Sequence, residues 1–278
     1  MPIVVHAFKF SLGPLTITGF GIAMVMAFMI AQYVSESEME RRGYDPKPFA
    51  DITLGAVVGG LLGAKIYYVL LTGSSLFTRD GFVFWGGLIG GLIGTAVVAR
   101  MKKLQYASLS DHTAPGLAAA YAVGRTGCWA VGDDYGRAWN GPFAVTFPEG
   151  APPSTVENMQ SAFHLPVAAG TPPGTLVSVH PTQLYEVTLA LVMFAILWRM
   201  RDHKHATGWL FGLYFALAGV ERFIIEFFRA KDDRFFGLFT LAQMFALAFV
   251  ATGLLWMRLR ATTGPGRPGI YAPRAAKA

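Results

Sequence analysis

Several ionisable side chains lie inside long apolar stretches of this sequence. The clearest cases are Lys65, Arg125, Arg222 and Glu226. A charged group in such a stretch is costly and by default marks a functional site. Arg222 and Glu226 are four residues apart, so they share one face of a helix. Because guanidinium groups form paired, charge-assisted hydrogen bonds with phosphate, these residues predict a binding site for an anionic headgroup.

A second set of polar residues borders the same stretches. Arg125 and Asp133 are eight residues apart, which places them on one helix face about 12 Å apart along the axis. We expect both sets to lie at one depth and to form one pocket. The competing interpretation is a set of ion pairs that only holds the helices together. The bordering residues are Asp133, Asp134, His180, Gln183, Tyr185 and Glu186.

Two further residues have side chains that could take part in chemistry. Cys128 is the only cysteine, so it cannot form an intrachain disulfide. It could act as a nucleophile, but a lone buried cysteine is more often a small apolar filler. His180 precedes a proline at the start of an apolar stretch, where it could be a helix cap or a general base. The sequence predicts no metal site and no cofactor.

The composition shows which kind of element must position these residues. Of the 278 residues, 53% are hydrophobic and 14% are charged, and the mean hydropathy is +0.43. A soluble domain carries roughly a quarter charged residues, so long apolar runs replace charge here. The net charge of +6 comes from short basic clusters between these runs, which indicates membrane topology and not nucleic-acid binding. We therefore expect an all-α integral membrane protein.

About seven apolar stretches are long enough to cross a bilayer as helices. Glycine-rich faces in the second and third of them predict close packing of that helix pair. The predicted organisation is transmembrane helices 1–4 in residues 1–132, a small outward-facing head domain in 133–180, transmembrane helices 5–7 in 181–259, and a flexible basic cytoplasmic tail in 260–278. The predicted spans are 15–34, 52–71, 82–101, 114–132, 181–200, 208–228 and 236–258.

The basic residues also predict an orientation. The segments after the first, third and fifth spans, together with the C-terminal tail, hold most of the 23 lysines and arginines. Such segments stay in the cytoplasm. We therefore expect the N-terminus outside, the C-terminus inside, and the polar site in the outer half of the membrane. The segment 35–51 is charged and is expected to lie along the inner surface. In the head, residues 143–147 predict a strand.

Four sequence segments resemble the bacterial prolipoprotein diacylglyceryl transferases, over about residues 55–229. Residues 124–137, GRTGCWAVGDDYGR, are similar to the family signature G-R-x-G-N-F-x-N-x-E-x-x-G-R. Residues 180–186, HPTQLYE, nearly match its HPSQLYE segment. Residues 221–229, ERFIIEFFR, contain its R-F-x-x-E-x-x-R pattern, and residues 84–88, FWGGL, align with its F-H-G-G-L stretch.

This resemblance implies transfer of diacylglycerol from phosphatidylglycerol to the lipobox cysteine of a preprolipoprotein, in the bacterial plasma membrane. Arg125 and Arg222 would hold the phosphate, Glu226 would orient Arg222, and Asp133 would replace the glutamate of the signature. Lys65 would stand where the family usually has an arginine. Further residues expected at the phospholipid are Trp85, Arg137, Tyr185, Glu186 and Arg229.

The sequence also departs from the family. Trp85 occupies the position of a histidine, Cys128 and Val131 occupy the positions of two asparagines, and Phe20 replaces a tyrosine. Tryptophan cannot accept a proton, so His180 is the candidate general base. A paralogue with a different acceptor and a noncatalytic lipid-binding protein remain alternatives. A transporter is a third, but the buried charges stop in the outer half, whereas a pathway would need them throughout.

Overall fold

The computed structural model describes residues 2–13, 15–77, 81, 83–167, 170–231, 234–235 and 239–261. Within these ranges the chain forms eight α-helices and six short strands. The helices are α1 (Gly19–Arg41), α2 (Pro48–Thr72), α3 (Phe84–Met101), α4 (Tyr106–Val131), α5 (Val156–Ser161), α6 (Thr182–Met200), α7 (Trp209–Ile225) and α8 (Leu241–Leu259). The strands are β1 (Ile3–Val4), β2 (Lys9–Leu12), β3 (Leu15–Thr18), β4 (Val145–Thr146), β5 (Arg234–Phe235) and β6 (Phe239–Thr240).

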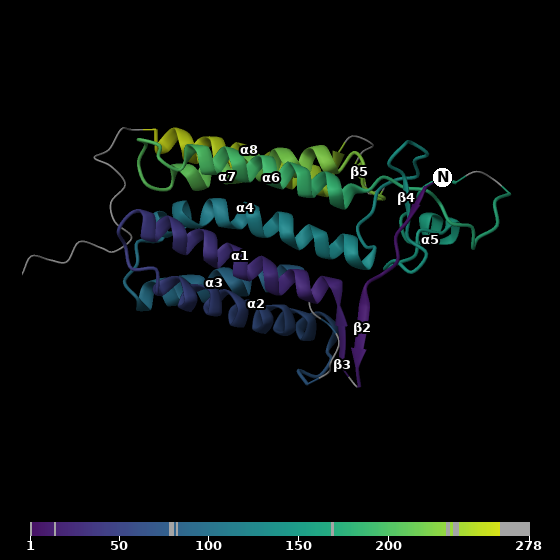
Figure 1. Cartoon of the computed structure of the whole chain (residues 1–278), viewed down its shortest axis with the longest axis horizontal. Helices are drawn as coiled ribbons and strands as arrows, with labels where there is room; N and C mark the ends of the chain where they lie inside the picture. Colours follow the sequence, from purple (N-terminus) through teal and green to yellow (C-terminus); the bar gives the residue numbers. More distant parts are fainter. Residues whose placement is uncertain are drawn as a thin grey trace, which may run out of the picture.

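The seven longer helices lie side by side, with α1 and α4 between the α2–α3 pair and the group of α6, α7 and α8 (Figure 1). Five of them, α1, α2, α3, α6 and α8, are long and apolar enough to cross a membrane by length and composition. Their outward-facing side chains are largely leucine, isoleucine, valine and phenylalanine, which suits a lipid environment. The chain is thus a helical integral membrane protein.

The first and fourth spans begin differently from what hydropathy predicts. Residues 15–18 form β3, which pairs antiparallel with β2, and α1 starts only at Gly19 after the cap Thr18. The helix then continues to Arg41, so residues 35–41 belong to α1, and a position along the inner surface stays a prediction for the segment 35–51. Helix α4 starts at Tyr106, eight residues before the predicted span. Its first turns carry Asp111 and His112, both fully buried, which a search for apolar runs overlooks.

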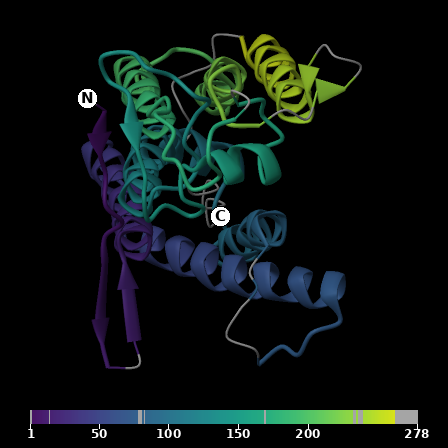
Figure 2. The same cartoon turned by 90° about the vertical axis from the view of Figure 1, so that its right-hand side faces the viewer.

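Glycines let α2 and α3 approach closely, as predicted. At Gly59, Gly63 and Gly90 an added Cβ would collide with backbone atoms of the facing helix. Such contact between backbones is the usual way in which small residues join helices in lipid. Figure 2 shows the α2–α3 pair on one side of the molecule, opposite α8.

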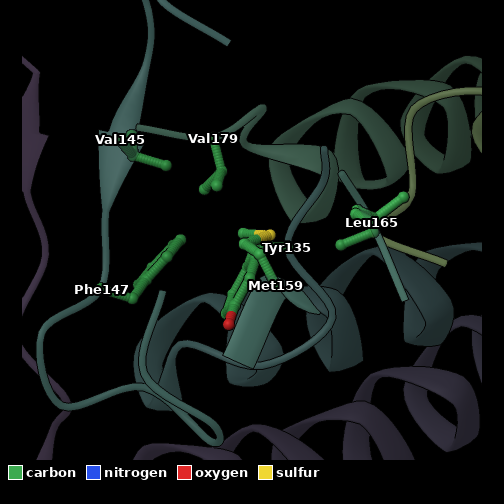
Figure 3. Close-up of a cluster of buried hydrophobic side chains, with 7 residues drawn as sticks. Tyr135, Val145, Phe147, Met159, Leu165 and Val179 are labelled. Carbon is green, nitrogen blue, oxygen red and sulfur yellow. The ribbon is translucent and has the colours of Figure 1, made fainter. Parts of the chain in front are cut away.

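The segment between α4 and α6 forms a small folded unit at one end of the helices (Figure 1). Its β4, within the predicted strand 143–147, pairs in parallel with β1, so the N-terminus joins this unit. The apolar interior of the unit is shown in Figure 3, where Tyr135 stacks on Phe147 at 5.5 Å between ring centroids. This unit closes over the end of the bundle where α4 finishes and α6 begins.

Two expectations include residues outside the described ranges. Of the predicted tail 260–278, the structure describes only Arg260 and Ala261. Of the predicted seventh span 236–258, residues 236–238 are not described, and α8 begins at Leu241 after a capping box formed by Thr240 and Gln243.

Candidate functional site

Arg125 lies near the end of α4 and contacts acids on two other elements. The residue is only 9% exposed. Its Nη1 donates to Asp134 Oδ2 at 3.0 Å and to Cys128 Sγ at 3.1 Å. Its Nη2 forms an ion pair with Oε2 of Glu186, which lies in the first turns of α6. Both terminal nitrogens of this guanidinium are therefore held by acids.

Asp134 joins α4 to the segment that follows α7. Its Oδ1 accepts a hydrogen bond from Arg229 Nη2 at 2.6 Å, while its Oδ2 accepts from Arg125. Burial alone would raise the pKa of this carboxyl, but the charges of Arg229 and Arg125 outweigh that effect and hold the pKa below its usual range. Asp134 therefore stays ionised between two guanidinium groups, and its φ of 54° shows how tightly the turn after α4 is formed.

The cluster continues along the end of α7. Glu226 Oε2 accepts from Arg222 Nη2 at 2.6 Å and lies 3.9 Å from Arg229 Nε. The Glu226 side chain is 1% exposed and the Arg222 side chain is 32% exposed. Arg222 thus presents its guanidinium at the accessible side of the cluster, with a buried carboxylate fixing its orientation.

Tyr121 extends the cluster in the opposite direction. It lies one helical turn before Arg125, and its hydroxyl is 3.2 Å from Glu186 Oε1 and 3.4 Å from Glu221 Oε1. Glu186 and Glu221 are 1% and 6% exposed, respectively. The polar network therefore joins three helices and the segments after α4 and α7.

His180 lies beside this network, immediately before α6. Its ring stacks on Trp139 at 4.4 Å between centroids, meets Phe228 edge-on, and its Nδ1 is 3.2 Å from the Tyr185 hydroxyl. Burial lowers the pKa of His180 below its ordinary value, so the imidazole is uncharged near neutral pH. Its backbone pairs with Gly136 and Arg137, which lie three residues or fewer from Asp134.

Gly136 and Arg137 tie the turn after α4 to the end of α7. At Gly136 a Cβ would collide with the backbone oxygen of Phe228 and with the His180 side chain. Arg137 Nη2 donates to the backbone oxygen of Lys231 at 2.7 Å. Only glycine therefore fits at position 136.

Asp133 is placed differently from Asp134. It lies beyond the end of α4, and its backbone oxygen accepts a hydrogen bond from Gln183 Nε2 at 2.6 Å. Burial raises the pKa of its carboxyl above the ordinary value, and the neighbouring charge of Asp134 adds to the rise. Cys128, Asp133 and Asp134 place potential metal ligands within 4.8 Å of one another. Since two guanidinium groups already neutralise Asp134, this group does not favour a metal ion.

Two residues predicted at the phospholipid lie on the α2–α3 pair. Lys65 Nζ is 5.4 Å from the centroid of the Tyr68 ring on α2. Trp85, at the start of α3, is half exposed and packs against Phe84 and against Phe245 of α8. The structure thus gathers Arg125, Glu186, Arg222, Glu226 and Arg229 into one network and places these two residues on other helices.

Sequence reasoning gave no role to three members of the network. Asp134 is expected only as a residue that borders the site, whereas it forms ion pairs with Arg125 and Arg229. Glu221 is given no role of its own and stands only as the residue before Arg222. Tyr121 was not considered, yet its spacing of four from Arg125 places it on the same helix face and could have identified it.

Comparisons with known proteins agree with the motifs. The profile of the family described as prolipoprotein diacylglyceryl transferase matches residues 7–259. A phosphatidylglycerol–prolipoprotein diacylglyceryl transferase of Xanthomonas euvesicatoria pv. vesicatoria is 29% identical, with 97% of this chain and 96% of the relative covered. The corresponding transferase 1 of Streptomyces coelicolor is 30% identical, with 95% and 75% covered. A relative of the same name in Corynebacterium diphtheriae is 29% identical, with 80% of each chain covered.

Proposed function

Because the chain belongs to the prolipoprotein diacylglyceryl transferase family, we propose that it transfers the diacylglyceryl group of phosphatidylglycerol to the lipobox cysteine of preprolipoproteins. The names of the relatives give the donor and the acceptor. The observation that carries the proposal is the cluster of Arg125, Arg222 and Arg229 at one end of the helices, each held by a carboxylate. Glycerol phosphate is the second product.

The leaving group is a negatively charged phosphate, so the reaction needs positively charged side chains beside it. The acceptor sulfur attacks the glyceryl carbon, the bond between that carbon and the phosphate oxygen breaks, and its electron pair stays on the phosphate. Arg125 and Arg222 hold the phosphate and stabilise the charge that develops there. Glu226 orients Arg222. His180 takes the proton of the thiol, and its uncharged ring suits that role.

The remaining residues are proposed to shape the lipid site. Asp134 holds Arg125 from the turn after α4 with Asp133 beside it, and Arg137 and Arg229 add positive charge nearby. Tyr185 and Glu186 line the start of α6. Lys65 and Trp85 contact the lipid from the α2–α3 pair, and the reaction needs no metal and no cofactor.

The proposed setting is the bacterial plasma membrane, with seven spans. Helices α4 and α7 would be the two further spans beside the five of clear length and hydropathy. The N-terminus and the 133–180 unit would face outward, as a head domain, and the C-terminal tail would be cytoplasmic. The arginine cluster would then meet the headgroups of the outer leaflet.

The test is mass spectrometry of the purified chain incubated with phosphatidylglycerol and a lipobox peptide. A diacylglyceryl adduct on the peptide cysteine, together with released glycerol phosphate, is the expected result. Glycerol phosphate without the adduct would indicate a different acceptor. Neither product, with lipid still bound, would favour a noncatalytic lipid-binding protein, which the half-exposed Trp85 at the family's histidine position makes the second candidate.

A further inference from the structure

The Tyr121 hydroxyl lies between two buried carboxylates. It is 3.2 Å from Glu186 Oε1 on α6 and 3.4 Å from Glu221 Oε1 on α7. A hydroxyl has one proton and can donate it to only one of these acceptors. If both carboxylates were ionised, one of them would face the tyrosine oxygen without a proton between them. That arrangement is costly at 1% and 6% exposure.

A single proton on Glu221 resolves the conflict. In the described part of the chain, Glu186 has an ion pair with Arg125, whereas Glu221 has no guanidinium within ion-pair distance. A protonated Glu221 donates to the Tyr121 oxygen, and Tyr121 donates to Glu186. The network then holds three positive and three negative charges, from Arg125, Arg222, Arg229, Asp134, Glu186 and Glu226.

Other titratable groups lie near Glu186, Tyr121 and Glu221 but do not join the two carboxylates. Tyr214 lies seven residues before Glu221 on the same face of α7. Cys128 and Asp133 approach from the side of Arg125. Among the described residues, only the Tyr121 hydroxyl lies within hydrogen-bond distance of both carboxylates.

Arg125 has spare hydrogen-bond donors only on the side that faces Glu186. Its Nη1 contacts Asp134 and Cys128, and its Nη2 contacts Glu186. Its Nε and Nη2 are buried and have N–H groups that no hydrogen bond within the described ranges uses. A phosphodiester bound there would lie, negative, beside the buried and negative Glu186 carboxylate. Binding of an anionic headgroup is therefore favoured when the charge on Glu186 moves away.

We propose that Glu221, Tyr121 and Glu186 form a proton relay that moves this charge when the donor phosphate binds Arg125. The proton of Glu221 passes to the Tyr121 oxygen while the hydroxyl proton of Tyr121 passes to Glu186. Glu186 becomes neutral, Tyr121 stays neutral, and the negative charge arrives on Glu221, on the far side of the tyrosine from the phosphate. The three are positioning residues for Arg125, and the inference rests on the proposed function.

Glu221→Gln tests the relay, because it keeps the resting charge and the hydrogen bond to Tyr121 but removes the proton that moves. The measurement is equilibrium binding of a short-chain phosphatidylglycerol to the full chain in detergent micelles, from about pH 6 to pH 9. The natural chain should bind with an affinity that hardly changes with pH. In Glu221→Gln, Glu186 must take its proton from water, so the affinity should fall by up to about tenfold per pH unit as the pH rises.

Three further variants separate the relay from a structural role. Tyr121→Phe removes the bridge but keeps the proton of Glu221, so no net proton has to come from water. Its affinity should fall at every pH, because the charge that arrives on Glu221 loses its hydrogen bond, without the pH dependence of Glu221→Gln. Tyr214→Phe removes a hydroxyl from the same face of α7 and should keep the natural, flat pH profile. Adding Glu186→Gln to Glu221→Gln removes the charge that has to move, so the double variant should recover most of the affinity lost at high pH.

A flat pH profile for Glu221→Gln would overturn the relay while leaving the proposed function in place, and so would a Tyr121→Phe chain that binds as tightly as the natural one. So would a double variant that binds as poorly as Glu221→Gln at high pH. Failure of the natural chain to bind phosphatidylglycerol at any pH would instead overturn the proposed function, and the relay with it.

Discussion

At the scale of single residues, the site is a set of arginines whose orientations are fixed before a substrate arrives. Arg125 is held by Asp134 and Glu186, and Arg222 is held by Glu226. Fixed guanidinium groups lose little freedom when they bind phosphate, and their planar shape makes two parallel hydrogen bonds. We therefore propose that the buried carboxylates belong to the binding site even where they do not touch the lipid.

The first prediction concerns these arginines. Arg125→Ala and Arg222→Ala should each lower the release of glycerol phosphate from phosphatidylglycerol by on the order of a hundredfold or more, since each removes a group that stabilises the leaving phosphate. Arg125→Lys should also be poor, because an ammonium cannot replace the paired hydrogen bonds of a guanidinium. Turnover close to that of the natural chain in either alanine variant would exclude the phosphate-holding role.

The second prediction concerns His180 and depends on pH. Burial lowers the pKa of His180 below its ordinary value near 6.5, so the uncharged ring, which can accept a proton, predominates at pH 6.5. A thiol with a pKa near 8.5 is mostly protonated there and mostly ionised at pH 9. His180→Ala should therefore reduce peptide modification more at pH 6.5 than at pH 9, measured as the rate relative to the natural chain at each pH.

His180→Gln provides the control for this prediction. Glutamine can still hydrogen-bond to Tyr185 but cannot act as a base. It should show the same pH-dependent loss as His180→Ala. Equal losses at both pH values, with recovery in the glutamine variant, would make His180 a structural cap of α6.

At the scale of elements, α7 carries Glu221 and Arg222 at one end and depends on Asp111 at the other. Asp111 on α4 is fully buried, and its carboxylate accepts hydrogen bonds from the backbone N–H groups of Gly208 at 2.7 Å and Phe211 at 2.9 Å. A residue of α4 thus caps the first turn of α7, which ties together the two helices that supply most of the network.

The third prediction follows from this cap. Asp111→Ala leaves two buried N–H groups without an acceptor and should lower the free energy of unfolding by about 1–3 kcal/mol. Asp111→Asn keeps one acceptor oxygen and should cost less. Thermal unfolding in detergent measures both variants. An unchanged melting temperature in Asp111→Ala would show that the cap contributes nothing to stability.

The same helices show what could be predicted from the sequence. Apolar runs located α2, α3, α6 and α7 to within a few residues, because these helices present apolar side chains to lipid. The start of α4 was missed because Asp111 and His112 are buried by tertiary contacts, which hydropathy does not report. The glycine pairs of α2 and α3 correctly indicated close packing. The β2–β3 hairpin was missed because its residues continue the apolar run of α1.

For the site, spacing located the groups but not their partners. Arg222 and Glu226 pair as the four-residue spacing predicts. Helix α4 ends at Val131, so residues 133 and 134 no longer follow the helical spacing. After this turn it is Asp134 that pairs with Arg125. The contact between Tyr121 and Glu221 depends on how α4 packs against α7, and no local pattern specifies that.

At the scale of the whole molecule, the two ends of the bundle differ in chemistry. One end carries the arginine network and the 133–180 unit. At the other, Arg41 and Arg42 pair with Glu38 of α1 and reach Asp202, which follows α6. Basic segments next to spans are retained in the cytoplasm. The end that carries Arg41 and Lys204 is therefore proposed to face inward and the arginine network outward.

The fourth prediction tests this orientation with single cysteines. Cys128→Ser gives a cysteine-free chain, because Cys128 is the only cysteine. Into it, Gln160→Cys places an exposed thiol on α5, and Lys204→Cys places one between α6 and α7. In intact spheroplasts a membrane-impermeant maleimide should label position 160 at once and position 204 only after permeabilisation. The reverse pattern would invert the topology, and labelling of both in intact cells would contradict a membrane crossing by α6, the helix between the two positions.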